Sequence, residues 1–301
     1  MRPVTVTVGP LAAASANNIC LSQSVNAGKT FLLNGSLATY SFQGTGSISN
    51  NTLTITALSS GILVGSPPYV STLLSGSNVA ANTSVLGPIL TTPGVTFNTT
   101  GSYVVTIPQT VSSTTIYGNA VATLDTPRRI LFTPAGNESA NTFTITGTDW
   151  NGTVVTEVLT GANATAFYSA LDYRTVTQIV PTNTTASTIT VGTTTIASSA
   201  WVRFDEYSTF PTAIQITVTG IANYTVQQTL QDSNNPFGVW QAPGLMPYQL
   251  TWINSADPAI VASTVSAQSS YTYAPIYAKV TLNSGTGSVS AVFSQNSSSS
   301  F

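Results

Sequence analysis

The chain has 301 residues, which is enough for two or three domains with well-buried cores. Only 5% of the residues are charged, the formal net charge is −2, and there is no histidine. Seven Lys and Arg residues are too few for an ordinary nucleic-acid-binding surface. No segment approaches the ~20 consecutive apolar residues of a membrane helix. Cys20 is the only cysteine, so an intrachain disulfide is excluded and a buried thiol is expected.

Alternating apolar and polar residues predict β-strands along the whole chain. In chain order, the clearest strand patterns are residues 4–8, 53–56, 103–107, 142–146, 154–159, 189–191, 214–218 and 289–293. Clusters of Gly, Pro, Asn and Ser separate these patterns. Residues 1–16 contain no continuous apolar run, so a strand is expected there rather than a signal peptide. The one weak helical candidate is residues 164–171. These patterns predict an all-β protein.

Residues 141–161 (NTFTITGTDWNGTVVTEVLTG) have the pattern of a β-hairpin. Two alternating segments flank the turn residues Asp149, Trp150, Asn151 and Gly152. Asn and Gly tolerate the positive φ angles of tight hairpin turns. The sequence therefore predicts two antiparallel strands here, with Trp150 exposed at the turn.

The distribution of charge predicts a domain boundary. Residues 31–124 contain no Asp, Glu, Lys or Arg, whereas charged residues recur from Asp125 onward. A segment rich in Ser, Thr and Gly, placed between flanks of less biased composition, is typical of a separate unit. We place this unit at residues 45–117.

Two motifs in this unit carry a resemblance to a known family. LTITALSSGILVGSPPYVSTLL (53–74) and TTGSYVVTIPQTVSSTTI (99–116) resemble a small β-module of tailed-bacteriophage structural proteins. The chain departs from that module at Pro67-Pro68-Tyr69 and Gly87-Pro88-Ile89, where the module usually has Gly-Thr turns.

The flanking sequences resemble a second phage family. In that family a segment similar to FLLNGSLAT (31–39) normally runs directly into one similar to VATLDTPRR (121–129). The resemblance implies tandem β-sandwich or barrel-like domains, with the small module inserted into the first. It implies a discontinuous N-terminal domain (1–44 and 118–198), the inserted module (45–117) and a C-terminal β-sandwich domain (199–301).

The residue inventory argues against an enzyme. Without histidine or an exposed cysteine, Ser-His-Asp and Cys-His catalysis are excluded. The adjacent acids Asp205 and Glu206 would point to opposite faces of a strand. Asp149 and Glu157 could approach each other across the predicted hairpin, but both are interpreted as facing solvent. No catalytic residue is therefore assigned.

The same inventory gives no metal or cofactor site. Asn137, Glu138, Asp149 and Asn151 could offer oxygen ligands to Ca²⁺ near one end of the hairpin. Their spacing matches no calcium motif, and Asn and Asp at turns more often bind their own backbone. We expect neither a metal nor a cofactor.

Candidate contact residues are arginines, large apolar residues of a loop, and the turn tryptophan. Arg128 and Arg129 could bind an acidic partner, or could pair with Asp125, Glu138 or Asp172 within the domain, and the second interpretation is favoured. Residues 236–247 contain three prolines and two glycines, so they are expected to form an irregular loop. The candidate subunit contacts are Trp150, Phe237, Trp240, Met246, Arg128 and Arg129.

These observations and the resemblance together predict a non-enzymatic structural subunit of a tailed-phage virion. Self-association, as a homotrimer or a higher symmetric oligomer, would cover sheet edges that lack protecting charges. A tail fibre or a capsid-decorating head fibre is expected first, and a tail-tube, adaptor or baseplate component is the alternative. A receptor-binding or polysaccharide-degrading tail protein is the alternative of a different class. The expected partners are other virion proteins, without nucleic acid or membrane, and a host surface glycan has no support in the sequence.

Overall fold

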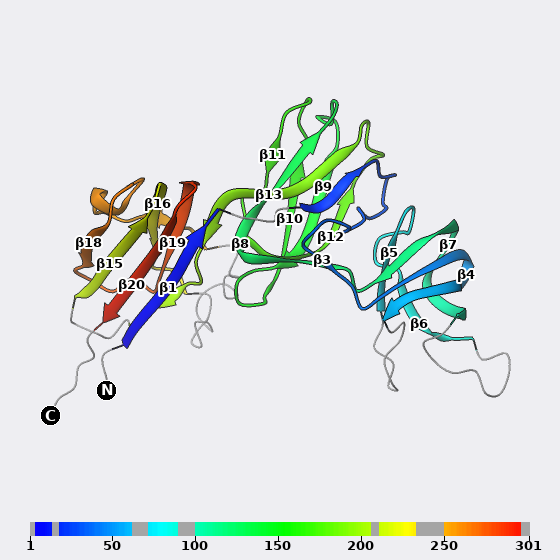
Figure 1. Ribbon diagram of the computed structural model, residues 1–301, viewed down its shortest axis with the longest axis horizontal. Helices are drawn as coiled ribbons and strands as arrows, with labels where there is room; N and C mark the ends of the chain where they lie inside the picture. The colour runs from blue at the N-terminus through cyan, green and yellow to red at the C-terminus, as the bar shows by residue number, and fades with distance from the viewer. Residues whose placement is uncertain are drawn as a thin grey trace, which may run out of the picture.

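The computed structural model describes residues 4–13, 18–61, 72–89, 100–205, 211–232 and 250–295 (Figure 1). Across these ranges the chain forms antiparallel β-sheets, and its one helical element is the 3-10 turn η2 (Pro258–Ile260). The predicted all-β fold is confirmed. The helical candidate at residues 164–171 is wrong: this segment contains the short strand β11 (Phe167–Tyr168), which pairs with β8 (Val121–Pro134). Pairing of Phe167 with Phe132 and burial against that strand override the weak local helical pattern.

The largest sheet, the middle sheet, has twelve strands and extends in Figure 1 from the centre of the molecule to β19 and β16 in its left part. Along its main path the strands are β10 (Val154–Thr160), β9 (Thr142–Thr148), β12 (Tyr173–Pro181), β8 (Val121–Pro134), β13 (Ile189–Ser198), β19 (Tyr277–Gly285), β16 (Ala222–Thr229) and β17 (Ile253–Asn254). Off this path lie β11, β14 (Val202–Arg203), β2 (Asn18–Gln23) and β3 (Ala38–Thr39). The end of β13 pairs with β19, so this sheet is continuous across the expected boundary at residues 198 and 199.

The predicted hairpin is confirmed within this sheet. Strands β9 and β10 pair antiparallel, from Val154 opposite Thr148 to Thr160 opposite Thr142. Gly152 has φ +81°, the positive angle that the turn requires.

A second, four-stranded sheet has the order β1 (Val4–Ala12), β20 (Ser288–Gln295), β15 (Thr212–Thr219) and β18 (Ala267–Tyr271). Its composition corrects the expected N-terminal domain, because β1 pairs with β20 and not with the strands that follow it in sequence. Val8 and Leu11 are buried in the same cluster as Phe293. The alternation VTVTV predicts which face of this strand is apolar, but it carries no information about a partner nearly 300 residues away.

The third sheet contains β4 (Phe42–Gly61), β7 (Gly101–Gly118), β5 (Thr72–Gly76) and β6 (Ser84–Pro88). Strand β4 bends at Asn50, where φ is +54°, and the Thr56 hydroxyl then donates to the Thr45 carbonyl (3.2 Å). The first half of β4 pairs with the second half of β7, and the second half of β4 pairs with the first half of β7. On the other edge of β7, β5 pairs with its second half and β6 with its first half, and β5 and β6 pair with each other. The pairings therefore close this sheet into a small barrel (right of Figure 1).

Buried apolar side chains of the described residues gather in three clusters. The first draws on residues 19–33 and 120–191, the second on residues 42–116 and the third on residues 8, 11 and 197–293. The middle sheet contributes to both the first and the third cluster because it is continuous at β13 and β19. The junction between these two clusters positions the candidate site.

Candidate functional site at the sheet junction

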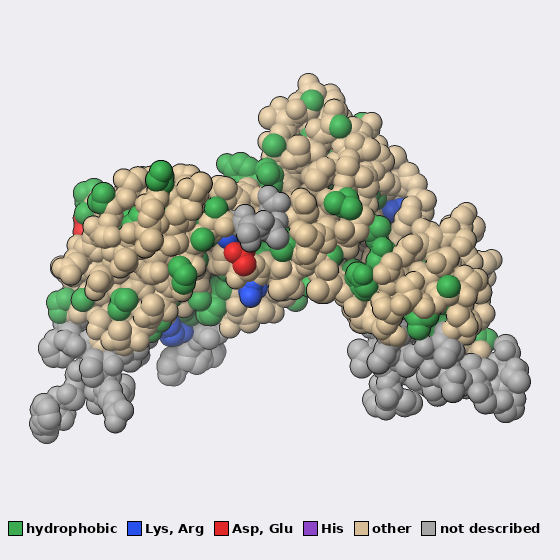
Figure 2. Space-filling model, in the orientation of Figure 1, with side chains coloured by type: hydrophobic (Ala, Val, Ile, Leu, Met, Phe, Trp, Pro, Cys, Tyr) green, Lys and Arg blue, Asp and Glu red, His purple; other side chains and the backbone are tan. Residues whose placement is uncertain are grey.

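A pocket of about 100 Å³ lies where the first and third clusters meet. Its walls come from the β9–β10 turn, the segment before β12, the end of β13 and strand β19. The lining residues are Pro127, Asp149, Trp150, Val155, Ala170, Leu171, Asp172, Ser198, Ser199, Trp201, Leu250, Trp252 and Lys279. On the face of the molecule shown in Figure 2 most of the surface is neutral, and a group of charged side chains lies near the middle of the view.

Three tryptophans form one aromatic group in the pocket wall. The Trp201 ring lies 5.7 Å from the Trp150 ring and 5.0 Å from the Trp252 ring, measured between centroids. Tyr277 on β19 contacts Trp201 from another side, at 5.7 Å. Trp150 is therefore half-buried against Trp201, which corrects the prediction that it is exposed at the turn.

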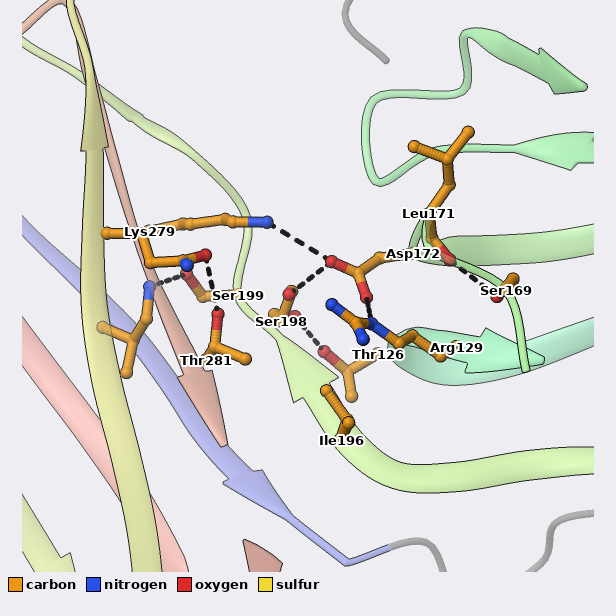
Figure 3. A network of polar contacts seen from close by, with 12 residues as sticks. Thr126, Arg129, Ser169, Leu171, Asp172, Ile196, Ser198, Ser199, Lys279 and Thr281 are labelled. Carbon is orange, nitrogen blue, oxygen red and sulfur yellow. Dashed lines mark hydrogen bonds and ion pairs between the residues drawn. The ribbon is translucent and has the colours of Figure 1, made fainter. Parts of the chain in front are cut away.

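Asp172 is the centre of a polar network beside these rings (Figure 3). Its Oδ2 accepts hydrogen bonds from the Ser198 hydroxyl (2.6 Å) and from the Lys279 ammonium (3.3 Å). Its Oδ1 lies 3.9 Å from Nε of Arg129, an ion-pair distance that is too long for a hydrogen bond. Lys279 also lies 4.8 Å above the centre of the Trp252 ring, a cation–π contact. The network joins β8, β13 and β19 at the junction.

Asp149 organises the hairpin turn that supplies one wall of the pocket. Its Oδ1 accepts from the backbone N–H of Asn151 (2.8 Å) and of Thr153 (2.9 Å). Its Oδ2 is buried and has no hydrogen-bond partner. Burial raises the pKa of this carboxyl above its ordinary value, against the opposing effect of the backbone donors. Asp149 is 6% exposed, so the prediction that it faces solvent is wrong.

Glu157 is placed away from Asp149, and the two acids do not form a pair. Glu157 lies opposite Ile145 in the hairpin. It is three residues further along β10 than Val154, the first residue of the strand after the turn, so it lies roughly 10 Å from the turn end of the strand at the usual rise. Its two carboxylate oxygens accept from the backbone N–H of Ala170 (2.7 Å) and Leu171 (3.1 Å). Burial raises its pKa. The prediction that Glu157 faces solvent is therefore wrong, because its carboxylate holds the backbone of residues 170 and 171 in place.

The two predicted contact arginines have different positions. Arg128 is fully buried, and its guanidinium donates to both carboxylate oxygens of Asp125 (2.8 and 2.7 Å), so it cannot contact another subunit. Arg129 is partly exposed, pairs with Asp172 and lies 5.7 Å above the Tyr168 ring. Both arginines therefore pair with carboxylates of their own chain, as the favoured interpretation expected. Glu138, which was a third possible partner, instead accepts hydrogen bonds from Ser187.

The predicted oxygen-ligand group is also separated in space. Glu138 precedes β9 and Asp149 follows it, so the two carboxylates lie at opposite ends of a seven-residue strand. Across the described part of the chain, no group of three or more His, Cys, Asp or Glu side chains could hold a metal ion. Cys20 is buried as expected, and burial raises the pKa of its thiol. Phe237, Trp240, Met246 and Glu206 lie outside the described residues.

The sequence patterns did not predict the pocket. Neither Trp201 nor Trp252 was singled out as a site residue from the sequence, and Asp172 was considered only as one possible partner of the arginines. Their common location depends on strands far apart in sequence, so no local spacing could have indicated it. Three of the four tryptophans of the chain line this pocket, but their positions in the sequence give no sign that they meet.

The chain matches no protein-family model, and no curated protein shows significant similarity to it. Among the described residues, the structure has no helix long and apolar enough to cross a membrane.

Proposed function

We propose that the protein is a non-enzymatic structural subunit of a tailed-phage virion that acts by self-association and docking. An outer appendage, either a tail fibre or a capsid-decorating head fibre, is the favoured location. The family resemblance of the sequence motifs supports the virion assignment, and the edges of the sheets support self-association.

The main support for self-association is the near absence of charge on the terminal strands of two sheets: the twelve-stranded sheet, and the four-stranded sheet that contains β1. Strands β1, β18 and β17 contain no charged residue, and β10 contains only Glu157. The carboxylate of Glu157 is occupied by the backbone of residues 170 and 171, so it does not protect the edge. Soluble monomers usually protect such edges with lysine or proline, because unpaired N–H and C=O groups recruit further strands, and of these four strands only β1 has such a residue, Pro10.

Strand β10 is the terminal strand whose exposed side chains are most apolar. Val154 is 61% exposed and Val158 is 62% exposed, and they lie on the same face of the strand. In a monomer these valines would face water, whereas an added strand from a second copy would cover them and extend the sheet. This edge is our candidate for the self-association surface.

The test replaces both valines with lysine in a Val154→Lys/Val158→Lys variant. We expect wild-type protein to form a symmetric oligomer, measured by light scattering after size-exclusion chromatography, and the variant to be a folded monomer. The matched control, Ile221→Lys/Val265→Lys, places the same charges at exposed apolar residues away from β10 and should leave the oligomer intact. A monomeric wild-type protein at all concentrations would contradict self-association.

The location on the particle is tested separately by labelling purified tailed-phage particles with gold-conjugated antibodies against the subunit. Label on a fibre or on the capsid surface supports an outer appendage. A sixfold or twelvefold ring at the tail axis would instead support a tail-tube, adaptor or baseplate role. Absence of the protein from purified particles would overturn the virion assignment.

A further inference from the structure

We infer that the junction pocket is a binding site for a neutral, polyhydroxylated ligand, with one monosaccharide unit as the natural occupant. This inference goes beyond the proposed structural role and does not depend on it. It rests on the chemistry of the lining residues, on their location between two packed units and on the size of the cavity.

The aromatic residues supply the apolar part of the site. Trp150, Trp201 and Trp252 come from three separate segments and contact one another through Trp201. Indole rings pack well against the C–H faces of sugar rings, and ligand pockets commonly combine such rings with a few polar groups at the boundary between domains.

The polar residues retain unused hydrogen-bonding capacity. Buried atoms without a hydrogen-bond partner occur in three lining residues: Oδ2 of Asp149, Nε1 of Trp150 and Oδ1 of Asp172. Lys279 has three N–H donors and directs one hydrogen bond to Asp172. A hydroxyl both donates and accepts, so a ligand with several hydroxyls matches a wall that offers both kinds of group.

The charges at the pocket favour a neutral ligand over an ion. Two carboxylates, Asp149 and Asp172, oppose an anion such as phosphate. A cationic ligand would be repelled by the Lys279 ammonium, which lines the pocket, pairs with Asp172 and lies 4.8 Å above the Trp252 ring. A purely apolar ligand would leave the unpartnered polar atoms unsatisfied.

The size of the cavity suits one sugar ring. Its volume of about 100 Å³ is roughly seven to ten times the ~10–15 Å³ that one water needs on the same measure, so the pocket has room for a small molecule and not for a longer chain of sugars. Binding without cleavage is expected, because one oxygen of each carboxylate is already held: Asp149 Oδ1 by the backbone N–H groups of Asn151 and Thr153, and Asp172 Oδ2 by Ser198 and Lys279.

The test follows the indole N–H signals by NMR while glucose, galactose or N-acetylglucosamine is added. A Trp240→Phe variant identifies the signal of the fourth tryptophan. We expect at least one of these sugars to shift the signals of Trp150, Trp201 and Trp252 saturably, with a Kd of about millimolar. Choline and inorganic phosphate should give no saturable shift.

Two matched variants separate the pocket from general effects on folding. Asp149→Asn keeps an oxygen for the turn and replaces the unpartnered acceptor with a donor, so we expect at least tenfold weaker sugar binding with an unchanged Tm. Asp257→Asn makes the same change in a distant turn, where Oδ1 accepts from Ala259 N–H, and should not weaken binding. No saturable shift with any neutral sugar would overturn the proposal, and so would preferential binding of choline or phosphate. Release of reducing ends from a polysaccharide would overturn the expectation of binding without cleavage.

Discussion

At the scale of single residues, Arg128 is the largest fully buried side chain in the described part of the chain. Its guanidinium donates to Asp125, to the Thr195 carbonyl (3.3 Å) and to the Ala12 carbonyl. The contact with Ala12 joins the end of β1, in the four-stranded sheet of β1, β20, β15 and β18, to β8 in the twelve-stranded middle sheet. In a chain with 5% charged residues, this buried cation is a structural connection between units.

We predict that loss of the anion destabilises the protein more than loss of the cation. Asp125→Asn leaves a buried guanidinium without a counter-charge, which costs about 3–5 kcal/mol. Arg128→Met leaves Asp125, whose side chain is 59% exposed and can be solvated, so the expected cost is about 1–2 kcal/mol. Urea unfolding measures both values. The double variant should be more stable than Asp125→Asn alone, and the reverse order of the two single variants would contradict this account.

We also predict that the contribution of this pair decreases on acidification. The hydrogen bond from Arg128 is the largest effect on the Asp125 carboxyl, and it holds the pKa of that group below its ordinary value. A lowered pKa in the folded state gives stability that is present above the pKa of the unfolded chain, ~3.9, and is lost as the pH falls through the lower folded value. The stability difference between wild type and Asp125→Asn should therefore be large at neutral pH and smaller at strongly acidic pH. Urea unfolding across this range tests it, and a pH-independent difference would contradict the assignment.

At the scale of elements, the closed barrel explains a compositional feature of the chain. Residues 31–124 contain no charge, and most of this segment forms the barrel built around β4 and β7. A closed barrel has no free edge, so it needs no charged side chains to prevent edge-to-edge pairing. The absence of charge therefore does not require a neighbouring subunit here, whereas the open edge at β10 is the one for which we propose a neighbouring copy.

The closure of the barrel depends on Gly118. It lies opposite Phe42, and a Cβ atom at Gly118 would lie 2.2 Å from Phe42 Cδ1 and 2.7 Å from Thr72 Cγ2. We predict that Gly118→Ala destabilises the barrel by about 1–3 kcal/mol, because the Phe42 ring must move in a packed interior. Hydrogen exchange should show faster opening of β4 and β7 and little change in β9 and β10. Ser113→Ala, at an exposed position of the same strand, is the control, and equal protection in both variants would contradict the prediction.

At the scale of the whole molecule, the barrel begins and ends at one place. Ser41 N–H donates to the Gly118 carbonyl (2.8 Å), and Phe42 pairs with Gly118. The barrel also contacts the middle unit through residues 26–30 and 78–81, including Ala81 N–H to the Gly28 carbonyl (3.2 Å). Two chain ends that lie side by side can be joined directly without moving the rest of the fold.

We predict that replacing residues 42–118 with a short Gly-Ser linker leaves a folded remainder with the same oligomeric state. The first and third apolar clusters lie outside the deleted segment, and no charged residue is removed. Circular dichroism, thermal unfolding and light scattering measure the outcome. A linker of the same length that replaces residues 121–160 is the control, since it removes β8, β9 and β10 and should not fold. An insoluble product from the 42–118 deletion would contradict the independence of the barrel.

The sequence by itself determined the all-β class and the β9–β10 hairpin. Both depend on local properties: alternation of apolar and polar residues over a few positions, and turn residues that tolerate positive φ. The burial of Cys20 also followed from its residue type.

Only the tertiary structure decided which distant segments meet. β1 pairs with β20 across almost the whole chain, and Trp150, Trp201, Trp252 and Lys279 reach one pocket from separate strands and turns. The same contacts bury Asp149, which the sequence analysis placed facing solvent, and Arg128, a candidate subunit contact for which pairing within the chain was the favoured interpretation. Strand alternation specifies a face but not a partner, because many strands with the same period of two could pair with any one edge.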